Sequence, residues 1–231
     1  MKKILILLLA CSIAHTTIAQ KFMVGIKGGI NYSTAPLGLK NAKSSLNHDQ
    51  VDDASGATNI LLGLKIGVDM KRFQVGLGFD YGKIGYSYDI NFGTTYTFKY
   101  SVTEPFLLPY VFASFKSRLP RSFIYYGVNA GYINLRLNNG KYGMESNYLY
   151  LPQRFPGHPY GGGHTGIVFG AQVGYTLNII KGLSASVETG VRYLPMDVAI
   201  VSYDINMGSY SYVSDKGMLT IPFTLGVNYT F

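Results

Sequence analysis

Apolar and polar residues alternate with a period of two in eight stretches of the chain. The stretches cover about residues 22–32, 59–70, 73–82, 96–115, 124–132, 166–177, 183–193 and 220–231. Such alternation is typical of strands that have one apolar and one polar face. From Thr220 to Phe231 every second residue is apolar without exception. The pattern predicts an all-β chain.

The connections between these stretches alternate in length. Those at 70–73, 116–121 and 178–182 are short, whereas 33–58, 134–164 and 194–216 are long and rich in Gly, Asn, Ser, Asp and Pro. Residues 91–94 are expected to form the tip of a tall hairpin. Apolar residues within 199–207 keep the parity of the seventh stretch, so we expect that strand to continue past Pro195. Short turns at one end and long loops at the other are typical of an up-and-down outer-membrane barrel.

One residue of the fourth stretch does not fit its alternation. Glu104 falls in phase with the apolar residues on either side of it, from Tyr96 to Tyr110. Either Glu104 lies at the membrane boundary, where a carboxylate costs less, or a bulge near Pro105 turns it away. We favour the boundary, because depth in the bilayer sets the cost of a charge.

Composition supports a membrane environment for one face of these strands. Charged residues make up 14% of the sequence, against about 25% in typical soluble domains. The polar face consists mostly of Gly, Ser, Asn and Gln, which is too sparsely charged for the exterior of a soluble sandwich or lipocalin-like barrel. In lipid every backbone polar group must pair within the protein, so a sheet has to close. We therefore predict a closed antiparallel transmembrane β-barrel of eight strands, or ten if a loop contributes another pair.

The first 19 residues have the form of a secretory signal peptide. Lys2 and Lys3 precede an apolar run, and small residues precede a cleavage site after Ala19. Residues 20–231 would then form one barrel domain. The alternative is a lipoprotein cleavage box ending at Cys11, which we disfavour because the chain stays signal-like through Ala19. Cys11 is the sole cysteine, so its removal would leave no disulfide or thiol chemistry.

Six charged residues fall on the predicted inward face: Lys27, Lys65, Asp69, Asp80, Glu188 and Arg192. Side chains just fill the interior of an eight-stranded barrel, so these charges need partners there. Glu188 and Arg192 lie roughly 13 Å apart along one strand, so we expect each to pair across strands. The set predicts a structural plug of ion pairs, with a proton or solute path as the alternative.

Candidate chemistry outside the lumen is sparse. The histidines that follow the signal, His48, His158 and His164, lie in predicted loops without a carboxylate or cysteine at ligand spacing. No metal site, cofactor or catalytic set is predicted, and a lipid-modifying enzyme at the rim is the disfavoured alternative. Basic residues cluster at strand ends, around Lys71-Arg72, 116–121 and Lys181, without interleaved aromatics. This arrangement suits a membrane surface and argues against a nucleic-acid partner.

The predicted long loops are rich in aromatic residues. They include Tyr142, Tyr148, Tyr150, Phe155, Tyr160, Tyr203, Tyr210 and Tyr212. Tyrosine gives a large contact area with few torsions, so these residues are candidates for recognition of protein partners. In a chain without Trp they also suit the outer aromatic girdle of a barrel.

The segments VGIKGGINYS, TEPFLLPYVF and LTIPFTLGVNYTF resemble those of small outer-membrane β-barrel proteins of Bacteroidetes-type bacteria. This porin-like family includes PorT-like proteins, and the resemblance extends over essentially the whole mature chain. The fourth strand of the family tends to carry a carboxylate two residues before the proline, where this chain has Thr103 next to Glu104. The resemblance implies no catalytic residues, and some relatives are linked to a protein-secretion apparatus.

The last stretch also fits the signal read by barrel-insertion machinery. Gly226 is followed by aromatic residues at the third-last and last positions, Tyr229 and Phe231. We predict that this strand closes the barrel against the first strand, with both termini in the periplasm and the long loops extracellular. The predicted function is non-enzymatic: a membrane scaffold or surface-interaction protein of the cell outer membrane, or an accessory to protein secretion. A narrow solute channel is the alternative.

Overall fold

The chain forms long strands that build a wall and short strands that lie outside it. The computed structural model describes residues 20–37, 50–92, 96–136, 141–143, 163–195, 198–200, 211–213 and 217–231. The long strands are β1 Lys21–Ser33, β2 Gln50–Asp69, β3 Phe73–Phe92, β4 Tyr96–Leu119, β5 Ser122–Arg136, β7 Gly163–Ile180, β8 Leu183–Leu194 and β11 Met218–Thr230. The short strands are β6 Lys141–Gly143, β9 Val198–Ile200 and β10 Ser211–Val213. Within the described residues, no helix is long and apolar enough to cross a membrane.

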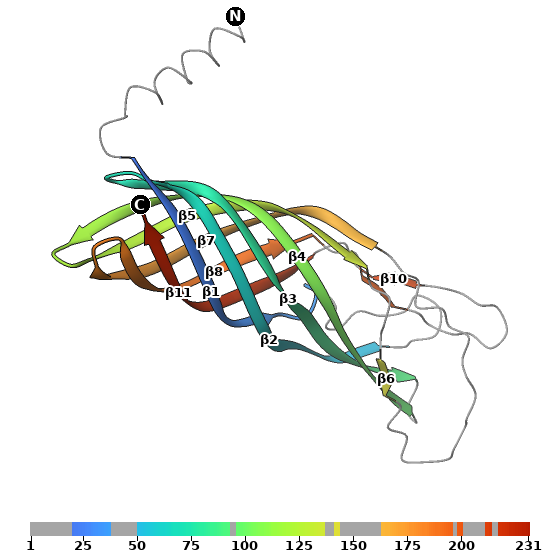
Figure 1. Cartoon of the computed structure of the whole chain (residues 1–231). Coiled ribbons are helices and arrows are strands. Elements are labelled where there is room, and N and C mark those ends of the chain that lie inside the picture. The colour runs from blue at the N-terminus through green and yellow to red at the C-terminus, as the bar shows by residue number, and fades with distance from the viewer. Residues whose placement is uncertain are drawn as a thin grey trace, which may run out of the picture.

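The long strands close into a barrel (Figure 1). Each pairs antiparallel with the long strands before and after it, and β1 closes the wall by pairing with β11. The closing ladder runs without interruption from Met23↔Thr230 to Ser33↔Thr220. The short strands do not enter the wall, because β6 adds to β4 while β9 and β10 form a separate sheet. The prediction of a closed antiparallel barrel with eight strands is confirmed.

The two ends of the barrel differ. At one end, here called the turn end, residues 70–72, 120–121 and 181–182 connect consecutive strands. Gly182 has a φ of 84°, in the left-handed region that favours glycine, and its carbonyl accepts a 2.7 Å hydrogen bond from Thr230 N–H. β1 begins and β11 ends at this end. At the opposite end, here called the loop end, β2, β3 and β4 extend past the other long strands towards β6 (Figure 1).

Two strand boundaries differ from the predictions at the loop end. β2 begins at Gln50, inside the predicted loop 33–58, whereas β3 and β4 form the predicted tall hairpin that pairs up to Phe92↔Tyr96. The expectation that the seventh strand continues past Pro195 is met only as far as a separate strand at 198–200, and residues 201–207 lie outside the described part of the chain. β8 ends at Leu194 and Val198–Ile200 pairs with Ser211–Val213 instead. Proline has no N–H for a ladder hydrogen bond, which explains the break.

β4 presents to the lumen the face that was predicted to contact lipid. Its exposed residues are Thr103, Pro105, Leu107, Pro109 and Val111, and its buried residues are Glu104, Phe106, Leu108, Tyr110 and Phe112. Glu104 therefore points inside the barrel, and the unbroken β3–β4 register shows no bulge at Pro105. Both explanations offered for Glu104 are wrong. β4 is apolar on both faces, so alternation alone could not decide which face is inward.

Candidate functional site

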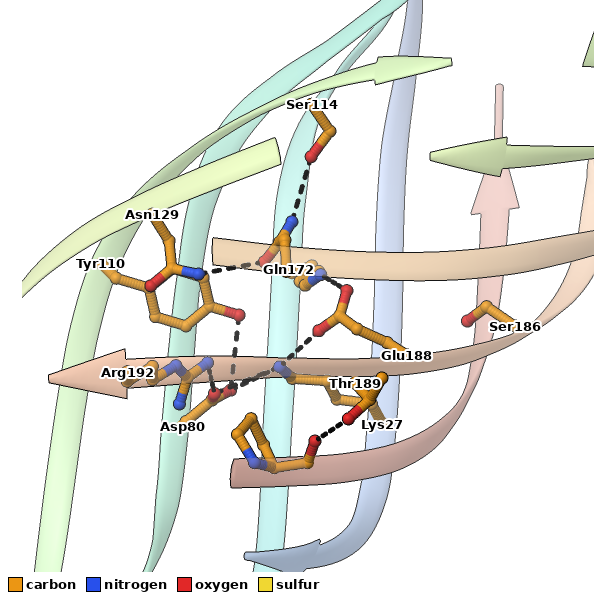
Figure 2. Close-up of polar contacts among 12 residues, drawn as sticks. Lys27, Asp80, Tyr110, Ser114, Asn129, Gln172, Ser186, Glu188, Thr189 and Arg192 are labelled. Carbon is orange, nitrogen blue, oxygen red and sulfur yellow. Dashed lines mark hydrogen bonds and ion pairs between the residues drawn. The ribbon is translucent and has the colours of Figure 1, made fainter. Parts of the chain in front are cut away.

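The inward side chains of six wall strands meet in one cluster of charges at mid-barrel (Figure 2). This ion-pair cluster comprises Lys27 of β1, Lys65 of β2, Asp80 of β3, and Glu188 and Arg192 of β8, together with the hydroxyls of Tyr110 and Tyr125. Every second residue of a strand faces the lumen, so each charge is oriented inward by the parity of its apolar neighbours. The cluster joins residues that are far apart in the sequence.

Asp80 is the centre of one half of the cluster and is fully buried. The Lys27 ammonium lies 3.1 Å from its carboxylate, Arg192 Nη2 donates to Oδ2 at 2.5 Å, and Tyr110 O–H donates to Oδ1 at 3.4 Å. One carboxylate therefore has three donors from three strands. A buried charge with several hydrogen bonds holds its geometry firmly, because losing any partner leaves an uncompensated charge.

Glu188 is the centre of the other half. Its carboxylate accepts hydrogen bonds from Lys65, from Lys27 at 3.2 Å and from Tyr125 O–H at 2.7 Å. Lys27 thus contacts both carboxylates and links the two halves. Glu188 and Arg192 each pair with residues of other strands and not with one another.

Aromatic rings of β4 and β5 surround the cations of the cluster. Lys27 Nζ lies 5.4 Å and the Arg192 guanidinium 5.1 Å from the centre of the Tyr110 ring. Lys65 Nζ lies 5.1 Å from the Phe112 ring and 5.7 Å from the Tyr125 ring. Three cations face two carboxylates, and the rings offer the remaining positive charge a favourable quadrupole in place of water.

Glycines opposite the two tyrosines make room for their rings. Gly78 pairs with Tyr110 and Gly174 with Tyr125 in the ladders. A Cβ at Gly78 would lie 2.1 Å from Tyr110 Cζ, and one at Gly174 would lie 2.3 Å from Tyr125 Cζ. Each ring therefore covers a neighbouring glycine, and this packing places the hydroxyl against its carboxylate.

Uncharged polar groups form a second network on β4, β5 and β7 (Figure 2). Asn129 Nδ2 donates to Gln172 Oε1 at 3.3 Å, and Gln172 Nε2 donates to Ser114 Oγ at 3.0 Å. All three side chains are buried. This amide network extends the polar filling across the side of the lumen opposite the cluster's β1 and β2 residues.

An apolar plug fills the lumen between the ion-pair cluster and the loop end. It consists of Leu61, Ile84, Phe106, Leu108, Ile133, Val168, Leu194 and Met218, all buried in one hydrophobic cluster. Seven wall strands contribute. On β4 the buried Glu104 lies on the loop side of Phe106 and Leu108, so one carboxylate borders the plug there. Sequence reasoning missed the plug, although its residues are visible as apolar side chains out of phase with the alternation, such as Leu61 between Ile60 and Leu62.

Asp69, the sixth predicted lumen charge, lies apart from the cluster. It forms an ion pair with Lys116 near the turn end. Lys116 was predicted to belong to a turn, but it is buried on the inward face of β4. A small polar cavity of about 50 Å³ opens beside this pair, lined by residues that include Lys65, Gln74 and Tyr125. Its size and polar lining suit a few water molecules.

The three residues of the predicted insertion signal lie on β11 and directly after it. Tyr229 and Phe231 are exposed at the turn end with their rings 4.8 Å apart, and Phe22 of β1 lies 5.9 Å from Phe231. Gly226 faces inward opposite Lys27. A Cβ there would lie 3.0 Å from the Ile26 carbonyl oxygen, so the glycine permits close approach of the first and last wall strands.

The predicted loop residues fall largely outside the described part of the chain. Tyr148, Tyr150, Phe155, Tyr160, Tyr203, Tyr210, His48 and His158 lie outside it. For Tyr142 in β6, Tyr212 in β10 and His164 in β7, the structure describes the backbone alone. Among the described residues, no group of three or more His, Cys, Asp or Glu side chains could hold a metal ion.

Comparison with known proteins shows similarity at the level of structure. No family model and no curated protein matches the sequence. Neisserial surface protein A matches with a TM-score of 0.50 and 9% identity, over 92% of this chain and 99% of that chain. The outer membrane protein OprG of Pseudomonas aeruginosa matches with a TM-score of 0.55 and 11% identity, over 90% of this chain and 95% of that chain. At these identities the likeness is one of fold: the chain has the closed antiparallel barrel that these proteins have.

Proposed function

We propose that this protein spans an outer membrane as a closed barrel that does not conduct, and that it acts by displaying its long loops. Its role would be that of a membrane scaffold or surface-interaction protein, with no enzymatic activity. An accessory role in protein secretion is one form of this function, and it rests on the resemblance to PorT-like proteins. The barrel would contact outer-membrane lipid through its wall and protein partners through its loops.

The outward face of the wall supports insertion into lipid. Large apolar side chains stand exposed on every wall strand, including Ile26, Ile60, Val128 and Leu225, which are 64%, 71%, 63% and 63% exposed. An apolar surface that surrounds a barrel far exceeds the patches found on soluble monomers. In a water-soluble barrel these side chains would face inward, and here the lumen holds the charges instead.

The occluded lumen is the observation that carries the proposed absence of conduction. An ion or solute would have to pass both the ion-pair cluster and the apolar plug. The first barrier has nearly every charge compensated by a partner from another strand, and the second is lined mainly by apolar side chains, which cannot replace the hydration shell of an ion. A narrow solute channel would need both layers to move.

The proposed orientation follows from the asymmetry of the two ends. Outer-membrane barrels have short periplasmic turns and longer extracellular loops. The turn end would therefore face the periplasm, with the start of β1 and the end of β11. Insertion machinery would read β11, where Tyr229 and Phe231 form an aromatic pair at the lipid interface. Replacement of Phe231 by Ala should lower the yield of inserted barrel, measured as heat-modifiable protein in the outer-membrane fraction, and an equal yield would contradict this part of the proposal.

Single-channel recording tests the central claim. Purified protein in planar bilayers should show no stable conductance steps. A variant that thins the apolar plug alone, Phe106→Ala/Leu108→Ala, should stay closed because the ion-pair cluster still blocks the lumen. Stable large steps from the wild-type protein would contradict the proposal and favour the channel. Loss of a lipid-modifying activity in a His158→Ala or His164→Ala variant would favour the enzyme instead.

A further inference from the structure

Four cations gather on two adjacent turns at the turn end of the barrel. Lys71 and Arg72 lie in the turn between β2 and β3, Arg118 lies near the end of β4, and Arg121 lies in the turn to β5. All four are exposed. The two turns are neighbours because β3 pairs with β4, and Lys116 N–H donates to the Arg72 carbonyl at 2.8 Å. These four residues are called the basic quartet below.

One hydrogen bond joins two members of the quartet, and no described carboxylate forms an ion pair with any of the four. Arg118 Nε donates to the Lys71 carbonyl at 3.0 Å, which draws the guanidinium over the neighbouring turn and leaves its two terminal nitrogens for another acceptor. The nearest carboxylate along these strands, Asp69, is engaged by Lys116. Within the part of the chain that the structure describes, none of the four cations forms an ion pair. Among the described residues, four positive charges therefore stand together without an ion-pair partner.

A row of aromatic rings lies next to the quartet on the outward face. Phe73 of β3, Phe115 of β4 and Tyr126 of β5 are partners across adjacent ladders. The Phe73 and Phe115 rings are 5.3 Å apart, and the Phe115 and Tyr126 rings are 5.4 Å apart. Aromatic side chains of barrel walls collect at the boundary between hydrocarbon and headgroups. Arg72 and Lys71 lie one and two residues beyond Phe73, Arg118 lies three beyond Phe115, and Arg121 lies five before Tyr126. With the row at this boundary, the four cations would lie at the level of the lipid headgroups.

From this juxtaposition we infer that the basic quartet binds the headgroup of an anionic phospholipid in the adjacent leaflet. The inference rests on the proposed function, because it needs the barrel to span a bilayer. Guanidinium groups bind phosphate oxygens in a bidentate manner, and two arginines with a lysine can contact one phosphodiester while the acyl chains pack on the aromatic row. A net-neutral headgroup brings its own ammonium group into the quartet, so an anionic lipid is preferred.

Lipid retention by matched variants tests the inference. The protein is reconstituted in phosphatidylcholine vesicles that contain a minor fraction of phosphatidylglycerol, extracted in mild detergent, and examined by native mass spectrometry for bound lipid. The wild-type protein should retain phosphatidylglycerol in preference to phosphatidylcholine. Arg72→Gln/Arg121→Gln should lower that preference by roughly fivefold for each cation removed, and high salt should lower it in the wild type. Lys83→Gln/Lys181→Gln, which removes two exposed cations outside the quartet, should change it less than about twofold.

The outcomes separate this inference from the proposed function. Band shifts on unheated gels first report whether each variant has inserted as a folded barrel. If the wild-type chain does not insert into phosphatidylcholine vesicles, the proposed function fails. If it inserts but retains both lipids equally, or if the quartet and control variants lose the same preference, the headgroup site is wrong and the barrel proposal stands.

Discussion

The two fillings of the lumen close the same barrel by different physics. The ion-pair cluster depends on a few directional contacts, with Asp80 and Glu188 each holding three donors. The apolar plug depends on contact among many side chains, none of which has a unique partner. A directional network is intolerant of losing one member, whereas an apolar cluster loses stability in proportion to the volume removed. The lumen therefore contains one layer that a single substitution should destabilise strongly, and one layer whose stability should fall in proportion to the volume removed.

Replacement of Asp80 should be the most damaging change. Asp80→Asn leaves the Arg192 charge buried without its carboxylate and leaves Lys27 with Glu188 alone, and the expected loss in unfolding free energy is about 3–5 kcal/mol. Urea unfolding in vesicles, followed by circular dichroism and gel mobility, measures it. Asp53→Asn, on the exposed part of β2, is the matched control and should change little. A loss below about 1 kcal/mol for Asp80→Asn would show that the stability of the cluster does not depend on this one carboxylate.

Truncation within the apolar plug should cost less for each residue. Leu108→Ala removes buried volume from the cluster, with an expected loss of about 3 kcal/mol. Leu107→Ala, the next residue on the same strand, points outward and should cost clearly less because surrounding lipid or water fills the space. The same unfolding measurement applies, and equal losses for the two variants would mean that the plug has no packed core.

Filling a glycine position should disturb the cluster through packing alone. Gly78→Ala forces the Tyr110 ring to move away from Asp80, with an expected loss of about 1–3 kcal/mol. Gly28→Ala is the control, because its added Cβ would meet no atom closer than 3.4 Å. If both variants unfold at the same urea concentration as the wild type, the ring position does not depend on Gly78.

The amide network should show the smallest effect. Ser114→Ala removes the acceptor of Gln172 Nε2, and a buried donor without a partner costs about 1 kcal/mol. Ser117→Ala, exposed on the same strand, should leave stability unchanged. A Ser114→Ala loss as large as that of Asp80→Asn would place the directional contacts of the lumen in one cooperative network.

The sequence predicted the wall well because lipid imposes a simple rule on it. Ile60, Leu62 and Leu225, for example, could be assigned outward from alternation alone, since a strand that crosses lipid has few other solutions. The inward charges of Lys27, Asp80 and Glu188 followed from the same parity. Their partners did not, because partnership across the lumen depends on the register and stagger of strands that are distant in the chain.

β4 is a strand in which the alternation of apolar and polar residues does not identify the inward face. Its residues from Pro105 to Phe112 are apolar or aromatic on both faces, so either face of this segment is compatible with lipid. The choice is made by the apolar plug and by Gly78, which only the neighbouring strand supplies. The plug itself was missed for a related reason. Outward apolar side chains were expected of a membrane barrel. The inward apolar side chains near the loop end are determined instead by packing within the lumen, which alternation does not report.

The β1–β11 ladder has a consequence for how quickly the barrel can form. It joins the two most distant strands of the described chain, so the contacts that close the wall have the highest sequence separation in the molecule. Contacts of that kind form slowly, because the entropy of closing the intervening chain is lost before any of them is gained. Until β11 meets β1, an almost complete sheet presents two unpaired edges and an apolar face. The interval before closure is therefore the time when aggregation competes most strongly with folding.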